Sequence, residues 1–208
     1  MFESEFFILV IIMLGVYFIA AIPFGYYLGL AFGVDLTKCG SGSTGATNVL
    51  RNIGKWQAVV VLILDALKGF VPVFYLKHYT NYFHDLNIFV GLFLLFLPLL
   101  AHSMSIYIGF KGGKSSATGL GILFAINWIA GLIIISIWAF TVTVSGISSL
   151  GSIVVGPLVP ILIWAFKEDI IFILFGIVAF VFVVLVKHRS NIARLLKGEE
   201  YSFKAKKD

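Results

Sequence analysis

A glycine-rich polar loop follows the first long apolar segment of the chain, and its residue types suit the binding of a phosphate. Residues 40–51 read GSGSTGATNVLR, with glycines at 40, 42 and 45. Glycine lets successive backbone N–H groups turn toward one point, and such a nest at the start of a helix is a ready anion site. Taken alone, the loop also fits a plain polar connection between membrane helices.

A second polar cluster, residues 109–119, reads GFKGGKSSATG and holds Lys111 and Lys114 among glycines. It is not a nucleotide-binding P-loop, because that motif needs a glycine five residues before Gly113, where Ile108 stands, and no strand precedes it. Lysine binds phosphate as a compact point charge. We therefore interpret the cluster as two lysines presented to a phosphate at the membrane surface.

Two further polar clusters lie in the second half of the chain, SSLGS at residues 148–152 and KHRSNIAR at residues 187–194. His188 and Asn191 are three positions apart, so on a helix they share a face, while Arg189 lies about 100° round. The two side chains on one face can reach one ligand. The alternative is an interfacial anchor for lipid headgroups.

Asp65 and Lys68 stand inside a strongly apolar segment, again three positions apart. Ionisable groups at membrane depth are costly unless they are paired. We expect a mutual salt bridge that fixes helix packing, and we keep a role in a substrate site as the alternative.

The elements that must position these clusters are membrane helices. The 208 residues are 60% hydrophobic and 12% charged, with a mean hydropathy of +1.05, which is typical of an integral membrane protein. Six apolar segments are visible, over residues 6–32, 56–76, 88–108, 117–144, 153–166 and 170–186.

The basic residues orient these segments. Of the 15 lysines and arginines, all but three follow the first, third or last segment, so these regions are cytoplasmic by the positive-inside rule. An even number of crossings must then separate Lys114 from the basic tail, yet only three segments lie between them. Residues 117–144 would form one helix of about 42 Å against a hydrocarbon core of about 30 Å.

We therefore predict that this segment splits near residues 127–131 into two short helices. The chain is then an all-α membrane protein of seven transmembrane helices, with the N-terminus outside and the C-terminus cytoplasmic. The polar stretch 145–152 also falls on the cytoplasmic side, so all four clusters share one face. One long tilted helix with a re-entrant segment elsewhere is the alternative.

The order of the motifs GSGSTGATNVLR, DALKG at 65–69, GFKGGKSSATG, SSLGS and HRSNIARLLKGEE closely resembles the PlsY family. These are membrane glycerol-3-phosphate acyltransferases that use acyl phosphate. The resemblance runs from Ile22 to Glu200 and implies a single multi-pass acyltransferase domain over residues 1–208. The family's seven-helix fold agrees with the crossing count.

The resemblance implies acyl transfer from acyl phosphate to the 1-hydroxyl of glycerol 3-phosphate, which gives lysophosphatidic acid and phosphate. The phosphate-binding loop of the family would hold the donor through backbone N–H groups, and a second set of positions would hold glycerol 3-phosphate. Whether His188 is also the general base stays open, and we favour a phosphate oxygen of the donor as the proton acceptor. The resemblance implies Arg51, Lys114, His188 and Asn191 as catalytic residues and Ser41, Gly42, Gly45, Thr47, Asn48 and Ser152 as substrate-binding residues. From the two loops themselves we add Ser43 and Lys111 to the expected substrate-binding residues.

Departures from the family pattern concern local geometry. Ser43 stands where the family loop usually has asparagine, Ser115 and Ser116 replace the usual residues after the lysine, and Ala101 precedes His102 in place of glycine.

The expected partners are the two substrates, the lipid bilayer and a soluble enzyme that produces acyl phosphate, in a bacterial plasma membrane with the active site toward the cytoplasm. No cofactor, metal or nucleic acid is expected. A transporter or scramblase of a phosphate-bearing small molecule is the alternative function, and a non-catalytic membrane anchor is a third.

Overall fold

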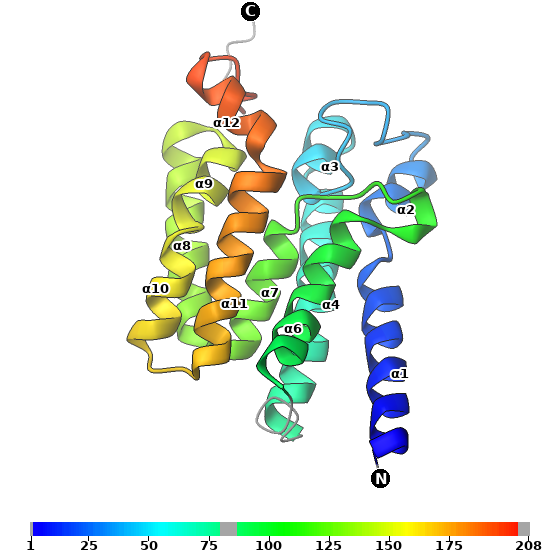
Figure 1. Cartoon of the computed structure of the whole chain (residues 1–208). Coiled ribbons are helices and arrows are strands. Elements are labelled where there is room, and N and C mark those ends of the chain that lie inside the picture. Colours follow the sequence, from blue (N-terminus) through cyan, green and yellow to red (C-terminus); the bar gives the residue numbers. More distant parts are fainter. Residues whose placement is uncertain (1, 80–86, 204–208) are drawn as a thin grey trace, which may run out of the picture. The chain divides into compact units, whose positions relative to one another are not determined.

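The computed structural model describes residues 2–79 and 87–203, and these residues are helical throughout their regular elements (Figure 1). Within these ranges, the β-type pairing is an isolated antiparallel bridge between Ser105 and Lys111. The chain divides into two compact units, Met1–Ile122 and Leu123–Asp208.

The first unit is built from α1, α4 and α6, which pack side by side, with the short α2 and α3 against one part of α4 (Figure 1). Ala20 and Ala21 are fully buried with Ala101, and these small side chains let α1 approach α6 closely. The elements of the unit are α1 (Phe2–Ala20), α2 (Phe24–Ala31), α3 (Ala46–Asn52), α4 (Lys55–Tyr79), α6 (Ile88–Ser103), η1 (Ile106–Ile108) and the first part of α7 (Ser116–Ile126).

The second unit begins within α7 and contains two helical hairpins, α8 with α9 and α10 with α11. α9 and α10 are bent by 42° around Gly156 and Pro157. Its remaining elements are α8 (Trp128–Ser145), α9 (Ser148–Val155), α10 (Leu158–Ala165), α11 (Ile170–Phe180), the π-helix η2 (Val181–Lys187) and α12 (Arg189–Leu196).

The predicted break in the long apolar segment 117–144 is confirmed, because α7 ends at Ile126 and α8 begins at Trp128. Asn127 between them caps α8, since its Oδ1 accepts from Ala130 N at 2.9 Å. Its Nδ2 donates to Glu168 Oε1 at 3.0 Å, which ties the start of α8 to the α10–α11 turn. An asparagine that serves as a cap interrupts an otherwise apolar helix.

The polar stretch 145–152, which the crossing count predicted to lie on the cytoplasmic side, is largely helical. Gly146 ends α8 with a φ of 75°, and α9 then begins at Ser148. The serines of α9 are compatible with a buried helix because Ser149 finds a partner there, donating its hydroxyl to Glu200 Oε1 at 2.9 Å.

Four described helical segments are long and apolar enough to cross a membrane, and five if the bent pair α9–α10 counts as one span. Two further apolar helices, α6 and α7, are shorter, and α7 with 11 residues would extend only about 16 Å. The seven-span count and the orientation of the termini stay predictions.

Candidate active site

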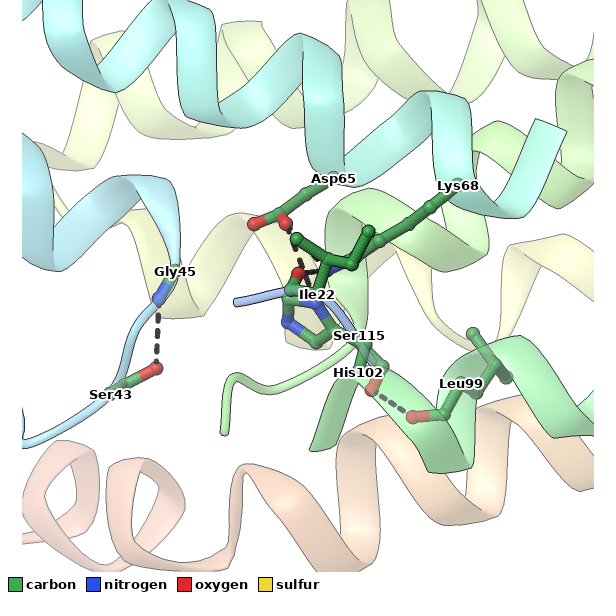
Figure 2. Close-up of polar contacts among 8 residues, drawn as sticks. All are labelled: Ile22, Ser43, Gly45, Asp65, Lys68, Leu99, His102 and Ser115. Carbon is green, nitrogen blue, oxygen red and sulfur yellow. Dashed lines mark hydrogen bonds and ion pairs between the residues drawn. The ribbon is translucent and has the colours of Figure 1, made fainter. Parts of the chain in front are cut away.

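The glycine-rich loop between α2 and α3 turns at two glycines. Gly40 and Gly42 have φ angles of 56° and 68°, in the left-handed region that a Cβ disfavours. Gly45 is extended, and its N–H donates to Ser43 Oγ at 3.4 Å (Figure 2). That bond is long for N–H···O, so an oxygen of a phosphate is able to take the place of the hydroxyl.

Asn48 lies inside this loop and holds its shape. It is 1% exposed, and its Nδ2 donates to Ser43 O at 2.8 Å and to Leu36 O at 3.2 Å. Its Oδ1 accepts from Ser41 N at 3.1 Å and from Asn52 Nδ2 at 3.0 Å. The side chain of Asn48 is thus engaged within the loop and shapes the candidate site through the backbone that it fixes.

The other loop candidates lie closer to the surface. Ser41 and Gly42 are exposed, whereas Ser43 and Gly45 are half-buried. α3 then carries Thr47 and Arg51 on one helical face, four positions apart, and both are half-buried. An arginine one turn from a threonine hydroxyl gives this face a charge and a hydrogen-bond donor for an oxyanion.

The loop with the two lysines follows α6 and η1. Lys111 is exposed and Lys114 is half-buried. The bridge from Ser105 N to Lys111 O, at 2.9 Å, closes a tight turn in which Gly109 and Phe110 have φ angles of 64° and 59°. Ser115, directly after Lys114, is buried and donates its hydroxyl to Leu99 O at 2.7 Å (Figure 2).

The predicted salt bridge between Asp65 and Lys68 is confirmed. Lys68 Nζ lies 2.8 Å from Asp65 Oδ1, and both side chains are 2% exposed. The third member is His102, to which sequence reasoning gave no role, and its Nδ1 lies 3.6 Å from the same Asp65 oxygen (Figure 2). The three residues form one buried cluster of ionisable side chains in the first unit.

In the second unit, His188 stands at the junction of the π-helix η2 and α12. Its Nδ1 is 2.7 Å from Val183 O, and because a carbonyl only accepts, that nitrogen carries the proton. In the neutral ring, Nε2 is then the acceptor. π-Helical turns are often found at functional sites, and this one directly precedes the buried His188.

Asn191 lies one turn further along α12 and is buried, while Arg189 is exposed. The predicted shared face of His188 and Asn191 is therefore present, and Arg189 points away from it. Asn191 Nδ2 donates to Glu200 Oε1 at 2.6 Å.

Glu200 is the centre of the polar contacts in this unit. Its side chain is 1% exposed, and it also accepts from Ser149 Oγ at 2.9 Å and from Arg194 Nε at 2.7 Å. Burial raises the pKa of Glu200, but the hydrogen bonds from Arg194, Asn191 and Ser149 outweigh it and leave the pKa below the ordinary glutamate value of 4.5. The carboxylate joins the chain after α12 to both α9 and α12.

The structure distributes the predicted site residues over both units. Ser152, His188 and Asn191 belong to Leu123–Asp208 and all the others to Met1–Ile122. Ser152 is buried in α9, one turn after Ser148 and Ser149. Sequence reasoning gave no role to Glu200 or His102, although both stand in the quoted family motifs, because nothing in a charged tail or an apolar helix shows which distant groups these two side chains meet.

The chain is similar to known proteins over most of its length. A family model described as glycerol-3-phosphate acyltransferase matches residues 10–198. A glycerol-3-phosphate acyltransferase of Synechococcus sp. (strain JA-3-3Ab) is 39% identical over 188 residues, covering 90% of this chain and 89% of the relative. The corresponding protein of Trichormus variabilis is 42% identical over 197 residues, covering 88% and 87%.

Two crystal structures of PlsY, an integral membrane glycerol 3-phosphate acyltransferase, are similar to this fold. The glycerol 3-phosphate form has a TM-score of 0.84 at 32% identity, and the lysophosphatidic acid form has 0.82 at 31%; each comparison covers 94% of this chain and 95% of PlsY. The helices and their apolar composition define an integral membrane protein. The chain belongs to the PlsY family of glycerol-3-phosphate acyltransferases.

Proposed function

We propose that this protein transfers an acyl group from acyl phosphate to the 1-hydroxyl of glycerol 3-phosphate, with lysophosphatidic acid and inorganic phosphate as products. The observation that carries the proposal is the family match over residues 10–198, with PlsY structures in glycerol 3-phosphate and lysophosphatidic acid forms as neighbours. Acyl phosphate as the donor is the finer part of the proposal. Its support is the glycine-rich loop, whose backbone suits a small anion.

The proposed reaction needs no nucleophilic side chain from the protein. The glycerol hydroxyl oxygen forms an ester bond to the acyl carbon, the bond from that carbon to the phosphate oxygen breaks, and the hydroxyl proton passes to a phosphate oxygen. Because a mixed anhydride already has a good leaving group, the protein acts by bringing two anionic substrates together, neutralising charge and excluding water.

The proposed roles follow the geometry of each unit. The loop that Asn48 fixes holds the donor phosphate, with the Gly45 N–H released from its long bond to Ser43 Oγ. Arg51 and Lys114 neutralise the phosphate charge of glycerol 3-phosphate.

His188 and Asn191 orient the glycerol hydroxyls in this proposal, and Ser152 contributes a hydroxyl. Because His188 Nδ1 carries the proton, Nε2 is the ring nitrogen with the chemistry to accept a hydrogen bond from a glycerol hydroxyl. Glu200 supports this role because its carboxylate accepts a hydrogen bond from the side-chain amide of Asn191 and so fixes that amide.

The proposal includes the topology. Seven crossings in a single domain, with the N-terminus outside and both basic loops and the basic tail inside, place the site toward the cytoplasm, where a soluble enzyme would deliver acyl phosphate. The part of that tail at residues 204–208 lies outside the described residues.

A transporter of phosphate-bearing small molecules is the competing function. The buried Asp65–Lys68–His102 cluster is the observation that would favour a path through the membrane. One assay distinguishes the two functions. It uses purified protein in detergent, where there is no membrane for a transported molecule to cross. Release of lysophosphatidic acid from glycerol 3-phosphate and synthetic acyl phosphate supports the acyltransferase, and no release contradicts it.

A further inference from the structure

We propose that His102, held by the buried Asp65–Lys68 pair, is a positioning residue that sets the backbone of the loop carrying Lys114. The inference rests on the proposed function in one respect, because it assumes that Lys114 binds the phosphate group of glycerol 3-phosphate.

The cluster joins three separate parts of the first unit. Asp65 and Lys68 belong to α4, His102 lies near the end of α6, and Lys68 Nζ also donates to Ile22 O at 2.9 Å in the break between α1 and α2 (Figure 2). All three ionisable side chains are at most 5% exposed. They are therefore fixed from several sides.

Such a cluster is poorly explained by stability alone. Removing charges from water costs free energy that their mutual attraction only partly returns, and apolar residues of similar volume often serve as well or better. Asp65 makes an ion pair with Lys68 and faces the imidazole of His102 through the same oxygen. At 3.6 Å the Asp65 carboxylate is an electrostatic neighbour of the ring rather than its hydrogen-bond partner, and it favours the orientation that turns Nδ1 of His102 toward it.

The loop that carries Lys114 packs against His102, on the side of the ring away from Asp65. Gly113 N donates to His102 O at 3.2 Å. A Cβ on Gly113 would overlap His102 Nε2, and a Cβ on Gly112 would overlap His102 O. The loop backbone therefore lies directly on His102, and only glycine allows this approach.

Lys114 is the residue that follows. On its other side, Ser115 is pinned to Leu99 O at 2.7 Å and has a φ of 63°, an uncommon conformation for a residue with a side chain. Lys114 thus stands between two fixed points, His102 through Gly113 and α6 through Ser115. The position of its ammonium group depends on both.

The contact between Gly113 and His102 allows a direct test. The three atoms that a Cβ on Gly113 would meet first all belong to the His102 ring, so shortening residue 102 removes the clash. We would measure KM and kcat for glycerol 3-phosphate and for acyl phosphate in purified Gly113→Ala, His102→Ala and the double variant.

The inference predicts that each single variant raises KM for glycerol 3-phosphate by about 10-fold to 100-fold, with little change in KM for acyl phosphate. The double variant should be no worse than His102→Ala alone. Independent effects that multiply in the double variant would overturn the inference. His78→Ala, at an exposed histidine of the same α4, is the matched control and should keep wild-type kinetics.

A second variant covers the case in which His102→Ala fails to fold. Asp65→Asn/Lys68→Met replaces the pair without leaving a buried unpaired charge. A positioning cluster predicts a raised KM for glycerol 3-phosphate at a melting temperature close to that of the wild type. A lower melting temperature with unchanged KM would mean a purely structural cluster and would overturn the inference.

Lys114→Ala separates this inference from the proposed function. If Lys114→Ala raises KM for glycerol 3-phosphate while the Gly113 and His102 variants behave independently, the positioning role alone is wrong. If Lys114→Ala leaves that KM unchanged, the proposed role of Lys114 is wrong and the positioning role is overturned with it.

Discussion

Glu200 Oε1 accepts a hydrogen bond of 2.6 Å from the side-chain amide of Asn191, nine positions earlier in the chain. The same carboxylate binds Ser149 of α9 and Arg194 of α12, so a single buried anion connects the segment after α12 to two helices. Asn191 is a proposed substrate ligand, and its amide is therefore oriented by a residue that need not touch the substrate.

Glu200→Gln should weaken both the fold and the site. The amide keeps the size of the side chain but loses the charge and presents a donor to groups that are themselves donors, with an expected loss of about 2 kcal/mol in stability. We expect a lower melting temperature in detergent and a raised KM for glycerol 3-phosphate. The neighbouring exposed Glu199→Gln is the control and should change neither quantity. Equal behaviour of the two variants would contradict the account.

The stability of the folded protein should depend on pH through the protonation of Glu200. Its pKa is lowered in the folded protein, so its contribution is fully present above the ordinary, unfolded pKa of 4.5 and is lost as pH falls through the lower folded pKa. We expect the wild-type melting temperature to fall more steeply than that of Glu200→Gln as pH is lowered from about 5 to about 3. Parallel curves would mean that Glu200 does not titrate as proposed.

The two loop glycines should respond differently to alanine. Gly42 has a φ of 68°, so Gly42→Ala strains the loop by about 1 kcal/mol as well as disturbing donor binding. Gly45 has a φ of −77°, and the nearest atom to an added Cβ is Ser43 Oγ at 3.7 Å, so the free protein accommodates Gly45→Ala. We expect Gly45→Ala to raise KM for acyl phosphate at an unchanged melting temperature. Near-wild-type kinetics for both variants would refute the donor-binding role of the loop.

His188→Gln distinguishes a positioning histidine from a general base. If His188 orients a glycerol hydroxyl, the loss should be about 10-fold to 100-fold and the pH profile should survive. Removal of a general base should cost about 100-fold to 10,000-fold in the chemical step and abolish the acidic limb. Single-turnover rates against pH are the measurement, and loss of the acidic limb at unchanged substrate affinity would contradict the positioning role.

The sequence predicted the parts of the fold that depend on local pattern. The break at Asn127 followed from helix length and crossing parity, and the Asp65–Lys68 pair followed from the cost of isolated charge in an apolar helix. The shared face of His188 and Asn191 followed from helical spacing.

Contacts between distant segments could not be predicted in this way. Glu200 meets Ser149 across 51 positions, and His102 faces Asp65 from another helix. Neither contact produces a periodic pattern in the amino-acid sequence from which it could be predicted. The helical start of α9 at Ser148 was also missed, because a serine-rich stretch is typical of a loop until a buried carboxylate satisfies one of its hydroxyls.

The donor is the central claim, and one measurement tests it most directly. Purified protein is incubated with glycerol 3-phosphate and either synthetic acyl phosphate or acyl-CoA of the same chain length, and lysophosphatidic acid is quantified. The account predicts turnover with acyl phosphate and none with acyl-CoA, because the glycine-rich loop suits a small anion. Comparable turnover with acyl-CoA would contradict it.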